Sequence, residues 1–153
     1  MTYLIAEVAR HQPVSAKAAR VWDLISAEDA ILKWHPSVAQ CVSGMDQAGR
    51  ITRAMTLHAT GGGAPVRMDE TELLRSAEIM TITYMVEIHG LPIRNYLAQM
   101  SITPHGQASC QATLRSRFTM PEAAHSGADD LVGGFYEAGL TRLAALMGAA
   151  DPA

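Results

Sequence analysis

One carboxylate falls on a strand face that is otherwise apolar. In the alternating segment 66–72, Glu70 shares its face with Met68, because successive side chains of a strand point to opposite sides. Burial of an unpaired carboxylate is costly and raises its pKa, so Glu70 is a candidate general acid/base or ligand anchor. The alternative is a structural salt bridge with an arginine on a neighbouring strand, such as Arg53, or a bulge that turns Glu70 outward. Asp69 and Glu72 are expected on the solvated side.

The segment Trp34-His35-Pro36 offers a second candidate. Histidine changes charge near neutral pH, so His35 at the mouth of a cavity would act as an acid/base group, with Trp34 lining the ligand beside it. The alternative is structural: Trp34 packs short helices onto a sheet, and His35 binds a backbone carbonyl group.

Two tyrosines, Tyr84 and Tyr96, lie on strand faces whose other members are apolar. Their phenols would hydrogen-bond a carbonyl or hydroxyl group of a ligand, or else pack in the core with the hydroxyl satisfied internally. The other side chains expected to line a ligand cavity are Met55, Met68, Met100, Phe118, Phe135 and Gly139. Flexible thioethers suit an adaptable apolar pocket, although plain core filling explains them equally well.

Several kinds of chemistry lack support. No histidine pair has metal-ligand spacing with a carboxylate, so no metal site is predicted. No serine or cysteine sits in the signature of a nucleophile. The net charge is −3 and the densest basic cluster is Arg115 with Arg117, which argues against a nucleic-acid partner.

The cysteines and the N-terminal residues indicate the cellular compartment in which the protein is expected. Cys41 and Cys110 are far apart and have no second cysteine nearby, which favours a reducing compartment. Glu7 interrupts the apolar run at the start of the chain, so neither a signal peptide nor a membrane span is predicted and a cytoplasmic location is expected. A homodimer is left open.

Predicted strands and helices must position these residues. The first of them along the chain is a strand over 2–12. A helix over 16–25 is predicted to start behind Ser15, whose hydroxyl suits an N-cap. Ser26 is predicted to cap a second short helix, which ends before Pro36 because the residue before a proline disfavours helix.

Alternating apolar and polar residues between 37 and 120 predict about six further strands. After Pro121 the spacing becomes helical, and one long helix is expected from a cap at Ser126 to Met147, with Leu131 among its apolar residues. Strands that follow one another through short turns form an antiparallel meander, and only the long helix can cover its apolar face. The length of 153 residues suits a single domain, 1–153.

Four segments carry a resemblance to a known family. They are Ser15-Ala-Lys-Ala-Ala-Arg-Val-Trp22, Lys33-Trp-His-Pro36, Met68-Asp-Glu-Thr71 and Leu91-Pro-Ile-Arg-Asn-Tyr96. With the order of elements, they resemble the SRPBCC superfamily, and in particular its polyketide cyclase/dehydrase branch. The resemblance implies an α+β, START-like helix-grip fold: a curved antiparallel sheet of about seven strands around a long C-terminal helix, with two short helices after the first strand. It implies a ligand cavity between sheet and helix, an inward glutamate at Glu70, and no cofactor.

Three functions follow as hypotheses. The first is binding of a hydrophobic small molecule, such as a polyketide, lipid, quinone or aromatic compound, in the internal cavity. The second is a cyclase or dehydratase in which Glu70, His35 or a tyrosine moves protons. The third is a protein-interaction module, which requires a large exposed apolar patch instead of a closed cavity.

Overall fold

A seven-stranded antiparallel sheet dominates the computed structural model, which describes residues 1–59 and 63–149. The strands are β1 (Tyr3–Val14), β2 (Val38–Met45), β3 (Ile51–Leu57), β4 (Val66–Ser76), β5 (Thr81–Ile88), β6 (Arg94–Pro104) and β7 (Cys110–Pro121). The helices are α1 (Ala18–Ile25), α2 (Ile31–Trp34), α3 (Glu122–His125) and α4 (Ala128–Ala149).

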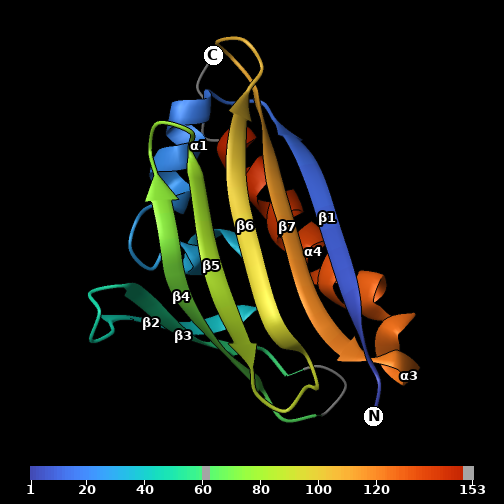
Figure 1. Ribbon diagram of the computed structural model, residues 1–153. Helices are drawn as coiled ribbons and strands as arrows, with labels where there is room; N and C mark the ends of the chain where they lie inside the picture. The colour runs from blue at the N-terminus through green and yellow to red at the C-terminus, as the bar shows by residue number, and fades with distance from the viewer. Residues whose placement is uncertain (60–62, 150–153) are drawn as a thin grey trace.

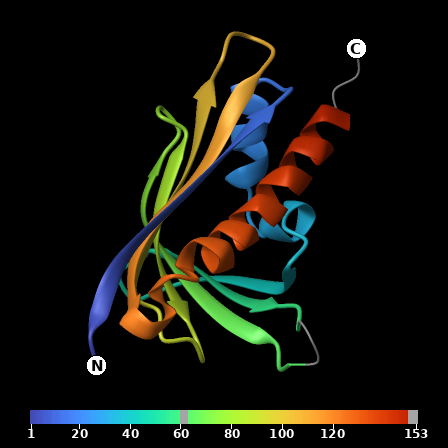
Figure 2. The same ribbon diagram turned by 90° about the vertical axis from the view of Figure 1, so that its right-hand side faces the viewer.

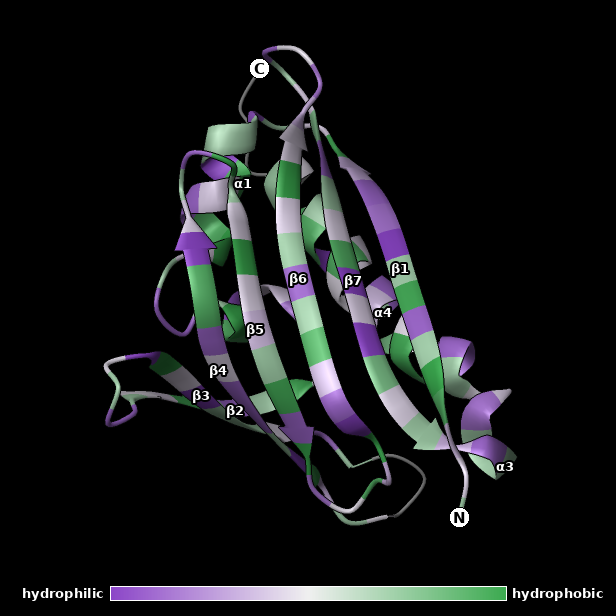
Figure 3. Ribbon diagram, viewed as in Figure 1, coloured by the Kyte–Doolittle hydropathy of each residue, from purple (hydrophilic) through white to green (hydrophobic). Residues whose placement is uncertain are grey.

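The strand order is β1-β7-β6-β5-β4-β3-β2 (Figure 1). Strands β2 to β7 therefore form the predicted meander, and β1 returns to pair with β7 along its whole length, from Tyr3 opposite Pro121 to Val14 opposite Cys110. Hydrophobic and hydrophilic residues alternate along the strands (Figure 3), as expected for a sheet with one face covered and one face open to solvent.

The long helix α4 runs across the covered face of the sheet, and α1 and α2 lie beside it (Figure 2). The residues of α4 that are buried recur three or four positions apart: Ala128, Val132, Tyr136, Leu140, Leu143 and Met147. Leu131, which was expected on this stripe, is exposed, so that prediction was one position out. The predicted architecture of a curved sheet, a long C-terminal helix and two short helices after the first strand is confirmed.

An ion-pair cluster ties α4 to the edge strand β1. The Arg10 guanidinium donates to Asp129 at 2.8 Å and to Glu137 at 2.7 Å. Because Asp129 and Glu137 lie two helical turns apart, one arginine fixes both the position and the direction of the helix.

The predicted helix starts were wrong at three serines. Strand β1 runs to Val14, and α1 begins only at Ala18 without a side-chain cap. Ser26 follows α1 and donates its hydroxyl to the carbonyl oxygen of Trp22, so it closes that helix instead of opening α2. Ser126 is the C-cap residue of α3. A serine beside an apolar run fits either end of a helix, since its hydroxyl both donates and accepts.

The buried apolar residues form one main core between the sheet, α1 and α4, and a smaller cluster of Val38, Met55 and Met68. In the described part of the chain, no helix combines the length and apolar character needed to cross a membrane.

Candidate functional site

An internal cavity of about 60 Å³ lies between the covered face of the sheet, α4 and the segment joining α1 to α2. Six of the predicted site residues line it: Trp34, His35, Glu70, Tyr84, Met100 and Phe135. This volume holds a few water molecules. It is well below the roughly 300–1,000 Å³ of typical small-molecule pockets.

The other five predicted ligand-binding residues lie outside this lining. Met55 and Met68 face each other across β3 and β4 in the smaller core cluster. Phe118 is buried and its ring stacks on that of Tyr96, with centroids 5.0 Å apart. Gly139 packs against Trp34 and His35, where a Cβ atom would lie 2.5 Å from the His35 ring.

Glu70 belongs to a chain of four charges in which two buried glutamates alternate with the half-buried Arg53 and the exposed Arg75. Arg53 of β3 donates to Glu70 at 3.0 Å and also to Glu72. Arg75 donates two hydrogen bonds to Glu72, at 2.8 and 2.7 Å. The salt bridge between Arg53 and Glu70, which was the structural alternative for this carboxylate, is therefore present.

Glu72 was expected on the solvated side, and that prediction was wrong, because only 5% of its surface is exposed. Residues two apart on a strand share a face, so Glu72 follows Glu70 inward. Two arginines satisfy its carboxylate, and this pairing makes the burial of its charge tolerable.

The two glutamates have opposite pKa shifts. Burial raises the pKa of Glu70 above its usual value, against the opposing influence of Arg53. Burial also acts on Glu72, but hydrogen bonds from Arg75 and Arg53 outweigh it and lower the pKa of that carboxyl. A site with two carboxyl groups tuned apart in this way can supply one proton donor and one permanent charge.

His35 is held as a neutral imidazole. The backbone N–H of Ser37 donates to Nδ1 at 3.2 Å, so Nε2 carries the proton and donates to the carbonyl oxygen of Phe135 at 2.9 Å. Burial lowers the pKa of His35 to about 4, with the bond to Phe135 acting in the opposite direction. Both ring nitrogens of His35 are thus hydrogen-bonded. The contact with Phe135 is the one expected under the structural alternative, in which His35 binds a backbone carbonyl group.

Three phenols gather at the inner part of the site. The hydroxyls of Tyr96 and Tyr136 hydrogen-bond each other at 2.7 Å in the core. Tyr84 lines the cavity with 8% of its surface exposed, and its hydroxyl has no hydrogen-bond partner among residues 1–59 and 63–149. Burial, followed by the charge of Glu70, raises the pKa of Tyr84 well above its usual value, so this phenol is a neutral hydrogen-bond donor.

Arg53 lines the cavity beside Glu70, although the sequence suggested it only as a salt-bridge partner. Tyr136 and Asp29 also line the cavity and were not among the predicted site residues. The alternation that identified Glu70 would have found Glu72 as well, whereas nothing local in the sequence indicates that Asp29 approaches the sheet.

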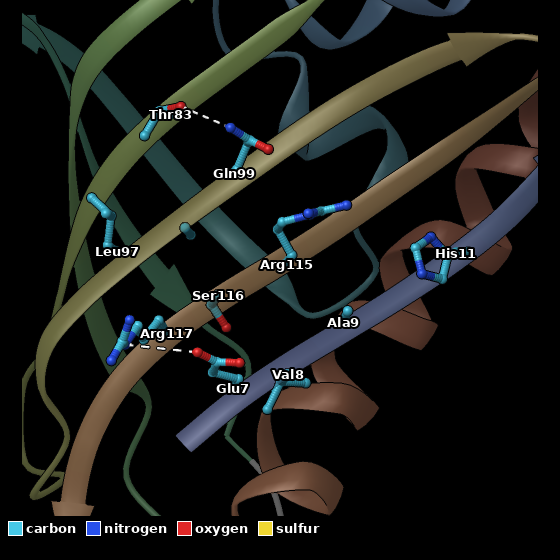
Figure 4. Close-up of a pocket in the computed structure, with 11 residues that line it drawn as sticks. Glu7, Val8, Ala9, His11, Thr83, Leu97, Gln99, Arg115, Ser116 and Arg117 are labelled. Carbon is cyan, nitrogen blue, oxygen red and sulfur yellow. Dashed lines mark hydrogen bonds and ion pairs between the residues drawn. The ribbon is translucent and has the colours of Figure 1, made fainter. Parts of the chain in front are cut away.

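Other depressions are open to solvent and contain little of this chemistry. One lies on the face of the sheet turned away from α4, with Glu7, Gln99, Arg115 and Arg117 around it (Figure 4). It contains no predicted site residue, and its only ion pair in the described chain joins Arg117 and Glu7 at 3.8 Å. Its exposed, weakly paired charges are typical of an ordinary solvated surface.

The fold agrees with a family comparison. Residues 6–148 match the family described as polyketide cyclase/dehydrase and lipid transport. The chain belongs to this family. No curated protein matches this family member in sequence.

Solved structures share the fold of this polyketide cyclase/dehydrase family member at low identity. The Zhui aromatase/cyclase from Streptomyces sp. R1128 is 13% identical with a TM-score of 0.79, covering 94% of each chain. Norcoclaurine synthase from Thalictrum flavum, in complex with dopamine and hydroxybenzaldehyde, is 16% identical with a TM-score of 0.76, covering 99% of this chain and 91% of that one. A protein from Thermobifida fusca is 22% identical with a TM-score of 0.78, covering 95% of each.

Proposed function

We propose that the protein binds a hydrophobic small molecule in the cavity between the sheet and α4. The observation that carries this proposal is Tyr84, a buried residue whose hydroxyl lines the cavity and hydrogen-bonds no other described residue. A cavity-facing phenol hydroxyl that is not engaged by the protein is available to hydrogen-bond a polar atom of a ligand.

The charges beside Tyr84 support the same proposal. Arg53 and Glu70 line the cavity together with the apolar side chains of Ile82, Met100 and Leu114. A buried ion pair is seldom worth more to stability than well-packed apolar residues. A mostly apolar cavity with a few convergent polar groups is the usual form of a small-molecule site.

The relatives favour small organic ligands without specifying one. The family description includes cyclases, dehydrases and lipid transport, and norcoclaurine synthase was solved with dopamine and hydroxybenzaldehyde. Polyketides, lipids, quinones and aromatic compounds therefore remain the proposed ligand classes. The cysteines are both unpaired, which suits a reducing compartment such as the cytoplasm.

A cyclase or dehydratase activity is the second candidate, favoured by the opposite pKa shifts of Glu70 and Glu72. In this mechanism the Glu70 carboxylate takes the proton from the carbon next to the substrate carbonyl, and Tyr84 hydrogen-bonds the oxygen of the resulting enolate. The carbon–carbon double bond forms as the neighbouring hydroxyl leaves, and Glu70 returns the same proton to that hydroxyl, which departs as water. Glu72 keeps its charge and holds Arg53 in place.

Native mass spectrometry of the protein purified from its own host tests the binding proposal. A stoichiometric co-purifying small molecule, identified after denaturing extraction, is the expected result. The Tyr84→Phe variant should lose most of this cargo while keeping its fold, whereas Tyr3→Phe, far from the cavity, should retain it. A protein that carries no small molecule and gains no thermal stability from a panel of hydrophobic compounds would contradict the proposal.

A further inference from the structure

A second hollow lies directly beside the internal cavity. This mouth cleft, of about 480 Å³, is formed by the segment joining α1 and α2 together with β2, β3 and β4. The cleft and the cavity share Ala27, Asp29 and Arg53 as lining residues. The linker Ser26–Ala30 is therefore part of the wall between the two spaces.

We infer that the cavity and the mouth cleft are two halves of one ligand site, divided by the linker Ser26–Ala30 and joined when that linker is released from β2 and β4. This inference rests on the proposed function, because it describes how a ligand reaches the site. The cavity alone is too small for an organic ligand. The cavity with the mouth cleft has the required volume.

Two contacts hold the linker against the sheet. On β4, Nη1 of Arg75 donates to the carbonyl oxygen of Ser26 at 2.6 Å. On β2, the hydroxyl of Ser43 donates to the Asp29 carboxylate. We call these the β4 latch and the β2 latch.

The linker itself contributes little to its own position. Its two ends are tied by short backbone bonds, from the N–H of Ser26 to Trp22 at 2.9 Å and from that of Lys33 to Ala30 at 2.8 Å. Between them the backbone bonds are long: the N–H groups of Ala27 and Ala30 donate to Leu24 and Ala27, each at 3.3 Å. Asp29 has a φ of 57°, a left-handed conformation that non-glycine residues keep only where surrounding contacts enforce it. Loss of the latches should therefore allow the linker to move.

The two halves differ in chemistry, which defines the class of ligand. The cavity presents aromatic surfaces from Trp34, Tyr84 and Phe135. The mouth cleft presents the polar groups of Glu28, Ser43 and Arg75. An elongated molecule with an apolar body for the cavity and a polar end for the mouth cleft matches this division.

Hydrogen exchange of the linker amides tests the latches without any ligand. Arg75→Gln removes the β4 latch, and Ser43→Ala removes the β2 latch without changing the linker. Each should raise the exchange rate of the 27–30 amides about tenfold, the effect of one lost charge-assisted hydrogen bond. Arg67→Gln, an exposed arginine on the same strand, is the matched control and should change nothing.

Stopped-flow binding of the fluorescent probe N-phenyl-1-naphthylamine tests the joined site. Both latch variants should bind the probe several-fold faster than the wild type and Arg67→Gln, because more molecules are in the open state. Equal association rates in all four proteins, with unchanged linker exchange, would overturn the inference and leave the proposed function standing. Faster linker exchange with no probe binding by any protein would count against the proposed function itself.

Discussion

Nε2 of His35 lies 2.9 Å from the carbonyl oxygen of Phe135, and the two rings stack with centroids 4.1 Å apart. This contact joins the end of α2 to the middle of α4. Burial keeps His35 neutral against the opposing influence of this bond. Because both ring nitrogens of His35 are hydrogen-bonded, its imidazole is not free to exchange protons with a ligand.

The buried His35 should make stability depend on pH. In the unfolded chain it takes up a proton near its usual pKa of 6.5, whereas the folded protein resists protonation until about pH 4. The unfolded state therefore binds more protons between these values, and stability should fall as the pH drops from 6.5 to 4, by up to about 3 kcal/mol. Urea denaturation at several pH values measures this loss. It should be smaller in His35→Gln and unaltered in His105→Gln, and an NMR pKa of 6.5 for His35 would contradict the assignment.

The two inward glutamates should respond oppositely to neutralisation. Glu72→Gln removes a carboxylate held by two arginines, and we expect it to lower the free energy of unfolding at pH 7 by about 1–3 kcal/mol. Glu70→Gln removes a charge that burial disfavours, so stability should change by less than about 1 kcal/mol or rise.

Chemical denaturation at pH 7 compares the two glutamine variants with the wild type. Lowering the pH through the acidic range should remove the stabilisation from Glu72, whose pKa is lowered, but not any from Glu70, whose pKa is raised. Equal losses in both variants would show that the glutamates are equivalent.

Gly139 and Gly134 form a matched pair on α4. An alanine Cβ at Gly139 would lie 2.5 Å from the His35 ring and 2.9 Å from that of Trp34, whereas at Gly134 it would meet nothing within 4 Å. Gly139→Ala should destabilise the protein by about 1–3 kcal/mol through overpacking. Gly134→Ala should stabilise it by about 0.5–1 kcal/mol through helix propensity. Melting temperatures of the two variants that shift in the same direction would disprove the close packing of α4 on α2.

The buried hydrogen bond between Tyr96 and Tyr136 can be measured by a double-mutant cycle. Each single change to phenylalanine leaves the other hydroxyl in the core without this partner and should cost about 1–3 kcal/mol. The double variant should cost less than the sum of the two, with a coupling of about 1 kcal/mol. Strictly additive losses in denaturant unfolding would mean that the two phenols do not interact.

The sequence predicted the fold well because its main signals are local and repeated. Alternation over segments such as 66–72 fixes a strand and its faces, and the apolar spacing after Pro121 fixes the long helix. Single residues at helix ends were less informative, as Ser15 and Ser26 show. At Ser15 the reason is that strand pairing with β7 extends β1 up to Val14.

The site was predictable only in part. Trp34, Glu70 and Tyr84 were identified because a polar or aromatic group stood out on an inward face. Glu72 was expected outside although it shares a strand face with Glu70. Its partner Arg75 follows a bulge that shifts the register of β4 on β5, so simple alternation does not show that the two side chains meet. Asp29 reaches the cavity through contacts with β2, which no local pattern encodes.

The pairing of β1 with β7 has a consequence for synthesis on the ribosome. Strand β1 cannot pair with β7 until nearly the whole chain has been made. Pairings between segments that are distant in the sequence also form slowly. Until β7 and α4 emerge, the apolar face of the growing sheet is uncovered and β1 is an unpaired edge. Nascent chains that stop before Cys110 should therefore be the forms most prone to aggregation and most dependent on chaperones.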